Sequence, residues 1–380
     1  MSSTIVFIGD VMVGRMIGSK YTASPYKLVS EELVKKTIGV DYVIANLESP
    51  VVVNATTAGD HLQFKGSPNT LNELKWIDAF SLANNHINDC GSQGMDETIR
   101  ILEDAGFHHN GLFKEEYCPL LLEKDKIAVV TITDMMNIPF SEENKWDVMR
   151  AGEPRVMDVL KEYHEKGFFV ILYAHIGMLF SRYPNPVTYE YLHKCIDNGA
   201  DAVVTAHSHC LGCMETYKGR YIFHSIGDFV MDGNSFRRRR SGMLRMTIDN
   251  HNIISWEIIP AEINYEYQTV IPTASTSKKM MKMFGAVSQK LADHKGSYEH
   301  FFKWQYKKEM LSHSLSTLFF LLKTRGAGGM LKMIFLRYEE VCRMLRWVSK
   351  DRSRDQRDDD AIKADRKKFS QNELFDRNNH

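Results

Sequence analysis

The sequence predicts an α/β domain in which layers of sheet and helix pack on each other. Short runs of apolar and often β-branched residues recur through the first two thirds of the chain, and such runs are typical of buried strands. Between several of these runs lie amphipathic segments that end at or near a glycine, as helices often do. The chain has 380 residues, which is enough to bury a substantial core.

The expected elements follow one another along the chain. The apolar runs that predict strands are 4–8, 42–46, 80–84, 127–133, 168–174 and 201–206. The segments that predict helices are 95–106, 154–167 and 186–200. Residues 217–258 differ, because their apolar runs are separated by Gly, Asp and Asn. This pattern predicts added strands joined by tight turns.

Charge and pattern change after residue 272. Met, Phe, Leu and Lys recur at helical spacing, and residues 273–350 hold fifteen Lys and Arg against five Asp and Glu. Residues 1–272 carry about ten more acidic than basic residues. The sequence therefore predicts an α/β domain over residues 1–270 and a basic helical extension over 273–350. The charged, apolar-poor residues 351–380 are expected to be disordered.

The start of the chain and its cysteines bear on location. Residues 1–10 lack the charged front and apolar core of a secretory signal, and no run reaches the roughly 18 apolar residues of a membrane span. Six cysteines spread over the chain do not resemble a disulfide scaffold, so we expect most of them to be small core residues. We expect a cytoplasmic protein that can also lie peripherally at the inner membrane face.

Polar side chains cluster where the expected strands end. Ligands bind outside the carboxyl ends of strands in α/β sheets, and five of the strands end on a carboxylate, carboxamide or imidazole. The residues concerned are Asp10, Arg15, Asn46, Glu48, Asn84, Asn85, His86, Asp89, His175, His207 and His209. His207 and His209 would point the same way if their segment is extended. We expect these side chains to share one site.

Mixed oxygen and nitrogen donors suit Mn, Fe or Zn better than Ca or Mg alone. Two such ions bridged by a carboxylate activate a water, and a nearby histidine can protonate a leaving group. The set therefore favours metal-assisted hydrolysis with one or two divalent ions. Each residue has a simpler alternative, because Asp10 could cap a helix, Glu48 could lie in a solvated turn and His175 could be a buried imidazole.

Six motifs occur in order along the chain. They are GDVMVGR at 9–15, NLESP at 46–50, ANNHINDCG at 83–91, HIG at 175–177, AHSH at 206–209 and SIGDF at 225–229. They resemble the CapA family of bacterial capsule and poly-gamma-glutamate synthesis proteins, whose domain is similar to the calcineurin-like metallophosphoesterases. The resemblance covers roughly residues 3–262 and implies a metallophosphoesterase-like layered β-sandwich flanked by helices.

The resemblance also implies residue roles. One metal position would be held by Asp10, Glu48 and His209, and a second by Glu48, Asn85, His175 and His207, so that Glu48 bridges the two. His86 would be the leaving-group acid, oriented by Asp89. Arg15 and Asn84 would hold an anionic substrate group.

This sequence departs from the family pattern at two positions. Related phosphoesterases usually have a histidine where this chain has Met12, which leaves the first metal position one ligand short. The family asparagine of the Gly-Asn-Phe element is Asp228 here, which could supply a ligand or only a turn. Cys210 and Cys213 form a C-x-x-C pair, but no further ligands are left for a zinc knuckle and no helix start accompanies a redox pair.

Two charged regions lie outside these motifs. We expect the four arginines at 237–240 to form a solvated loop, although they could clamp a polyanionic or phosphorylated substrate. The helices of the extension either pack on the body, which we favour, or lie in a membrane interface, and their basic faces suit anionic lipid or a synthesis-complex partner. Nucleic acid is not expected, because aromatic residues are not interleaved with the basic ones.

The resulting prediction is a metal-dependent hydrolase that acts in the synthesis or processing of a capsule or poly-gamma-glutamate-type surface polymer. Its expected partner is an anionic polymer or a phosphorylated intermediate, with a phosphoester as the first candidate bond and an amide as the second. The alternative is a non-catalytic component of a membrane-associated synthesis or export complex. Met12 and the basic extension favour that alternative, whereas the intact Asn-Asn-His element opposes it.

Overall fold

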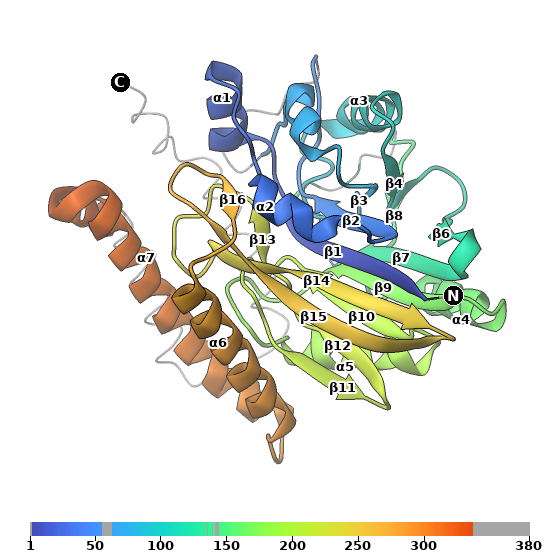
Figure 1. Ribbon diagram of the computed structural model, residues 1–380. Coiled ribbons are helices and arrows are strands. Elements are labelled where there is room, and N and C mark those ends of the chain that lie inside the picture. Colours follow the sequence, from blue (N-terminus) through green and yellow to red (C-terminus); the bar gives the residue numbers. More distant parts are fainter. Residues whose placement is uncertain (1, 55–62, 135, 139, 141–143, 337–380) are drawn as a thin grey trace.

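Two β-sheets packed face to face form the centre of the computed structural model, which describes all residues except 1, 55–62, 135, 139, 141–143 and 337–380 (Figure 1). The first sheet has the order β16-β15-β14-β1-β2-β3-β4, with β13 also paired to β1. Its strands are β1 (Ser3–Val11), β2 (Tyr42–Leu47), β3 (Ala79–Ser81), β4 (His108–Asn110), β13 (Asp228–Val230), β14 (Arg240–Asp249), β15 (Asn252–Ile263) and β16 (Thr269–Val270).

The second sheet has the order β11-β12-β10-β9-β7-β6, and a two-stranded ribbon β5-β8 lies apart from it. The strands are β5 (Leu112–Phe113), β6 (Leu120–Leu122), β7 (Ile127–Thr133), β8 (Asp147–Val148), β9 (Phe169–His175), β10 (Ala202–Ala206), β11 (Met214–Tyr217) and β12 (Arg220–Phe223). The expected strand at 80–84 is shorter in the structure, because the Asn84 amide donates to the Leu82 carbonyl and turns the chain.

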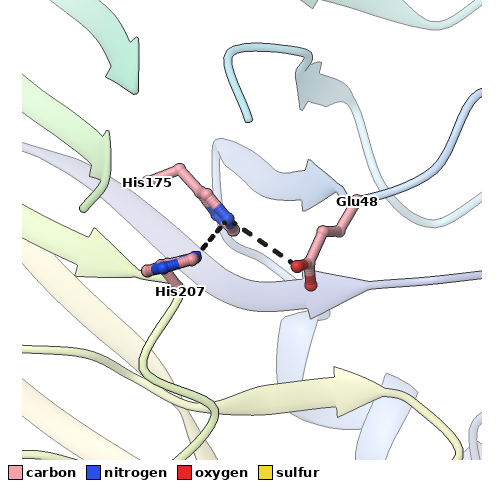
Figure 2. A group of neighbouring side chains, drawn as sticks. All are labelled: Glu48, His175 and His207. Atoms are coloured by element: carbon pink, nitrogen blue, oxygen red, sulfur yellow. Dashed lines mark hydrogen bonds and ion pairs between the residues drawn. The ribbon is translucent and has the colours of Figure 1, made fainter. Parts of the chain in front are cut away.

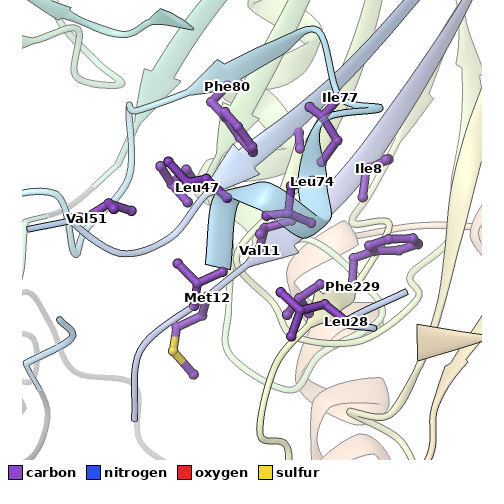
Figure 3. Packing of buried hydrophobic residues seen from close by; sticks show 14 of the residues in the cluster. Ile8, Val11, Met12, Leu28, Leu47, Val51, Leu74, Ile77, Phe80 and Phe229 are labelled. Carbon is purple, nitrogen blue, oxygen red and sulfur yellow. The ribbon is translucent and has the colours of Figure 1, made fainter. Parts of the chain in front are cut away.

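Helices cover the outer faces of both sheets. They are α1 (Arg15–Ala23), α2 (Glu31–Val34) and α3 (Gly91–Asp104) on the first sheet, and α4 (Pro154–Glu165) and α5 (Pro186–Asp197) on the second, with 3-10 turns η1 (Lys35–Thr37), η2 (Pro68–Leu74) and η3 (Glu123–Asp125). Successive side chains of β1 point to opposite faces of the first sheet. Phe7 packs between the two sheets. Ile8 packs under the helices of the first sheet (Figure 3). The α/β layered sandwich predicted from the sequence is confirmed.

The expected extension contains two long helices that run along one side of the body (Figure 1). They are α6 (Ala274–Ala292) and α7 (Tyr298–Leu336), and α7 is interrupted at Gly326, whose φ is 67°. Ser288 of α6 accepts a hydrogen bond from the Met214 amide at 2.9 Å, and the Tyr298 ring of α7 stacks on Tyr189 at 3.8 Å. Both helices thus pack on the body, as favoured. The expectations for 337–350 and 351–380 lie outside the described residues.

No helix among the described residues combines the length and the apolar character that crossing a bilayer requires.

Candidate metal centre

The ends of strands from both sheets meet at one place. Asp10 of β1 lies in register with Asn46 of β2 and with Asp228 of β13, and His175 ends β9. The approach of β13 to β1 needs Gly9, because a Cβ atom there would lie 1.8 Å from the Gly227 carbonyl oxygen. The glycine before the aspartate is therefore required by packing, and it lets the two strands deliver their carboxylates to one pocket.

The first possible ligand group consists of Glu48, His175 and His207, whose donor atoms all lie within 4.8 Å of one another (Figure 2). His175 Nε2 is 3.7 Å from Glu48 Oε1 and 2.9 Å from His207 Nδ1. The Asn85 amide oxygen is 2.8 Å from the same His175 nitrogen. One carboxylate, two imidazoles and one amide oxygen are thus gathered around a single point, which is a donor set that transition-metal ions accept.

The second possible ligand group consists of Asp10, Glu48 and His209, again within 4.8 Å. His209 Nδ1 is 3.8 Å from Asp10 Oδ2, and His209 Nε2 is 4.0 Å from Glu48 Oε1. Asp228 lies beside this group, with its Oδ1 at 2.7 Å from His209 Nδ1. The two groups share Glu48, which is the arrangement that the family resemblance implies for a bridging carboxylate.

Glu48 is the least satisfied member of the site. It is fully buried, so it does not lie in a solvated turn, and neither carboxylate oxygen has a hydrogen-bond partner among the described residues. Burial raises the pKa of Glu48 well above its usual range, and the carboxylates of Asp10 and Asp228 raise it further. A bound cation would remove this penalty, so the residues present fit a divalent metal ion.

Asp10 is also fully buried but is well supported. The Asn46 amide donates to its Oδ1 at 2.8 Å, and the His207 backbone N–H donates to its Oδ2 at 3.1 Å. Burial raises the pKa of Asp10, but the hydrogen bond and the charge of His175 outweigh it and leave the pKa below its usual range. Asp10 is not a helix cap, because α1 begins at Arg15 after Gly14.

The backbone at the two neighbouring histidines is strained. His207 has φ 93° and His209 has φ 56°, in the left-handed region that residues with side chains seldom occupy. The expectation of an extended segment is therefore wrong, because the chain coils after β10 ends at Ala206. The two imidazoles still enter one site, one in each ligand group. Strain of about 1–3 kcal/mol per residue is typical of functional sites.

His86 lies at the edge of the same pocket. Its Nδ1 is 2.7 Å from Asp89 Oδ2, and its Nε2 is 3.9 Å from Glu48 Oε1. The Phe64 ring stacks on the imidazole at 3.7 Å, and the Phe64 amide donates to Asp89. Burial lowers the pKa of His86, and Asp89 opposes this shift. The imidazole ring is thus held in one plane, with Nε2 directed at the two possible ligand groups.

The two residues expected to hold substrate are engaged with the protein. Asn84 is fully buried and donates to Asn46 Oδ1 at 3.2 Å and to the Leu47 carbonyl at 2.8 Å. Arg15 forms two hydrogen bonds to Asp232, and its guanidinium lies 5.1 Å from the centre of the Phe64 ring. Their substrate contacts stay predictions. The structure gives Asn84 a role in positioning instead, since its Oδ1 accepts from the His86 backbone amide.

The two departures from the family pattern have different structural results. Met12 is fully buried within the apolar cluster under the first sheet, and its sulfur accepts from the Gly14 amide at 3.1 Å (Figure 3). Asp228 is also fully buried but faces His209. Position 12 therefore supplies packing, while Asp228 adds a carboxylate next to the second ligand group.

The prediction of a solvated arginine loop at 237–240 is wrong for most of its members. Arg237 is buried and pairs with Glu309 of α7, and Arg239 is buried with its guanidinium 4.7 Å from the centre of the Phe320 ring. Their guanidinium groups donate to backbone carbonyls, among them one in α7, which the sequence alone could not place beside them. Only Arg238 faces the candidate site, at 3.4 Å from Asp228.

Cys210 and Cys213 are buried free thiols, as are Cys90 and Cys195, while Cys118 is exposed. The expectation of small core residues therefore holds for these four, and Cys342 lies outside the described residues. Neither member of the C-x-x-C pair joins a ligand group.

Sequence reasoning missed the aromatic parts of the site. Phe64 stacks on His86, and Phe180 lies 6.2 Å from His209 between ring centres. Asn137 also approaches His86, with 3.1 Å between its Nδ2 and His86 Nε2. Neither aromatic residue directly follows a strand end, and none of the three belongs to a quoted motif; Asn137 lies four residues after the end of β7, which is the local signal that could have found it.

One family model matches more than half of the chain. The family model described as bacterial capsule synthesis protein PGA_cap matches residues 4–233. The chain belongs to this family. The family resemblance inferred from the motifs is thereby confirmed, and capsule or poly-gamma-glutamate synthesis is the setting in which the family acts.

Relatives in the family are distant in sequence. The chain is 24% identical over 270 residues to the PGA biosynthesis protein CapA of Bacillus subtilis (strain 168), covering 68% of this chain and 71% of that protein. It is 24% identical over 279 residues to the capsule biosynthesis protein CapA of Bacillus anthracis, covering 68% and 67%.

A solved structure, the calcineurin-like phosphoesterase YfkN of Bacillus subtilis, is similar at 12% identity with a TM-score of 0.40, covering 75% of this chain and 98% of that one. A TM-score below 0.5 is too low to carry a function from that protein to this chain.

Proposed function

We propose that this member of the family is a metal-dependent hydrolase that acts in the synthesis or processing of a capsule or poly-gamma-glutamate-type polymer. The observation that carries the proposal is the Glu48 carboxylate. It is fully buried, it belongs to both groups of possible metal ligands, and neither oxygen has a hydrogen-bond partner among the described residues. A buried carboxylate in this state is costly without a cation beside it.

Six residues would hold the ions, namely Asp10, Glu48, Asn85, His175, His207 and His209. When bound, divalent ions supply an activated water and neutralise charge on a phosphoryl or carbonyl oxygen. His86, whose Nε2 lies 3.9 Å from Glu48 Oε1, would give a proton to the leaving group. Asp89 accepts from Nδ1 and, with the stacked Phe64 ring, fixes the direction of Nε2.

The bond that we propose first is a phosphoester of an anionic polymer or a phosphorylated intermediate. Arg238 lies at the second ligand group and offers a positive charge to such a substrate. An amide bond of a polyglutamate-like polymer comes second, because the same activated water can attack a carbonyl carbon. The competing function is a non-catalytic part of a polymer synthesis complex, which the loss of a ligand at Met12 favours.

Metal analysis and hydrolysis assays test the proposal together. Protein purified after exposure to Mn, Fe or Zn should contain one or two equivalents and should hydrolyse an aryl phosphate. The variant His86→Ala should keep the metal and lose the hydrolysis. Metal content near zero would contradict the proposal and favour the non-catalytic component. Metal retention without phosphatase activity would shift the test to an amide polymer.

A further inference from the structure

Helix α7 has two chemically different faces between Tyr298 and Arg325. Its inner face contacts the body, where Glu309 is buried and pairs with Arg182 and Arg237. Farther along the same face, the Phe320 ring packs edge-on against Phe236 at 5.5 Å. The inner face therefore accounts for the docking of the helix, and the opposite face has no part in it.

The outer face of α7 carries a continuous apolar stripe. Its members are Trp304, Leu311, Leu315, Phe319 and Leu322, and each is between 41% and 60% exposed. Steps of seven, four, four and three residues from Trp304 to Leu322 keep to one side of a helix with 3.6 residues per turn. The stripe is about 27 Å long at 1.5 Å per residue. We call these five residues the outer stripe.

Exposed apolar side chains elsewhere are scattered. Val187 on α5 and Ile254 on β15 are as exposed as the members of the outer stripe, but each stands alone on its element. A contiguous apolar surface marks an interaction site, whereas single exposed side chains are normal. The outer stripe therefore needs an occupant.

The charges beside the outer stripe indicate which occupant fits. From 300 to 328 the exposed charged residues are Lys303, Lys307, Lys308, Lys323 and Arg325, all of them basic; the exposed Glu299 in the first turn of the helix pairs with Lys303 at 2.9 Å. The acidic residue in this stretch, Glu309, is buried on the inner face. An apolar strip bordered mainly by positive charge suits a surface that is apolar inside and negative outside, as a bilayer with anionic headgroups is.

We propose that the outer stripe of α7 binds the surface of a bilayer that contains anionic lipid. Trp304 and the apolar side chains enter the boundary between headgroups and acyl chains, while the lysines reach the headgroups with their stems along the apolar surface. Lys308 already lies over the Trp304 ring, 4.6 Å from its centre. The helix lies flat on the surface, with its inner face still attached to the body. This inference does not depend on the metal centre.

Vesicle flotation of the full-length protein tests the proposal. The protein should float with vesicles of phosphatidylcholine and phosphatidylglycerol in a 7:3 ratio, and should stay in solution with phosphatidylcholine alone. The triple variant Leu311→Ser, Leu315→Ser, Phe319→Ser should partition at least tenfold less. The double variant Lys307→Gln, Lys308→Gln should lose roughly tenfold, because each basic residue contributes at an anionic surface.

Matched controls keep the result interpretable. Val187→Ser and Ile254→Ser remove equally exposed apolar side chains, and Lys161→Gln removes an exposed lysine of α4; all three should bind like the wild type. Thermal unfolding monitors folding of every variant. Equal flotation of the triple variant and the wild type would overturn the proposal. So would light scattering that shows a dimer of the wild type, a monomer of the triple variant and no lipid binding, because a second copy would then be the occupant.

Discussion

The two ligand groups share Glu48 but differ in what surrounds them. Around His175 and His207 the closest further polar neighbours are neutral amides, with the Asn85 oxygen and Asn46 Nδ2 both within 3.1 Å of a His175 nitrogen and Asp10 Oδ1 farther away at 3.4 Å. Around His209 they are charged, since Asp228 lies at 2.7 Å and Arg238 at 3.4 Å from Asp228. Imidazole favours the later transition metals and carboxylate tolerates Mn. The two positions should therefore differ in metal preference.

The variant that removes both positions is Glu48→Gln. It should lose both metal equivalents and reduce hydrolysis by about a thousandfold or more, because the amide cannot bridge two cations. Metal content by mass spectrometry and hydrolysis of an aryl phosphate measure this. Glu103→Gln, on an exposed part of α3, is the matched control. If Glu48→Gln kept its metal, a shared ligand would be wrong.

The same variant predicts a pH effect on stability without metal. Burial raises the pKa of Glu48 in the folded protein, so its contribution to stability is present at low pH and is lost as the pH rises through the folded value. Metal-free Glu48→Gln lacks this loss. We expect it to melt at least about 2 °C above the metal-free wild type at pH 8, which corresponds to about 1 kcal/mol, and the gap to shrink at pH 5. A melting temperature below that of the wild type at pH 8 would contradict this.

Single histidine variants separate the two positions. His207→Ala should lose one equivalent and His209→Ala the other, with hydrolysis reduced by about a hundredfold in each because one ion of the pair is missing. The comparison predicts that the equivalent kept by His209→Ala is the more selective for Zn. His164→Ala, at a largely exposed histidine of α4, should keep both equivalents. Loss of both ions in either variant would show that the two metal positions bind their ions interdependently.

Asp228→Asn should weaken metal binding at the second ligand group only. The carboxylate lies against His209, so its loss should weaken the second position by about 10- to 100-fold, as for other groups that orient a ligand. Titration of metal into metal-free protein, followed by calorimetry, would resolve the two affinities. An equal drop at both positions would mean that Asp228 acts through the overall charge.

The smallest expected effect is a shift of a pH profile. Asp89 raises the pKa of His86 against the effect of burial, so Asp89→Asn should lower it. Hydrolysis that needs a proton on His86 should then decline at a lower pH than in the wild type. The exposed Asp104→Asn should leave the profile in place. An unchanged profile would indicate that His86 is not the acid.

The sequence was sufficient for the layers and for most of the ligand positions. Apolar runs identify strands because a buried strand must be apolar, and strand ends identify sites because parallel strands meet at one edge. Asp10, Glu48, His175, His207 and His209 could be selected in this way.

Contacts between distant segments could not be predicted. The coil at His207 and His209 depends on how β10 ends against the first sheet, and Phe64 reaches His86 from a loop that carries no motif. The sequence predicted a solvated loop for the arginines at 237–240, because the groups that pair with them are Glu309 of α7 and backbone carbonyls that are distant in sequence. A charged run has no local sign of such partners.

The ion pairs between Glu309 and the arginines at 182 and 237 limit how this protein can be shortened. Replacing Glu309 alone would leave two largely enclosed guanidinium groups without their carboxylate, a loss of about 3–5 kcal/mol for a pair of this kind, and cutting before α7 would expose both of them together with the apolar surface that the helix covers. Helix α7, the last long helix of the part of the chain that the structure describes, is therefore an integral part of the folded body. Domain-based expression designs should retain it.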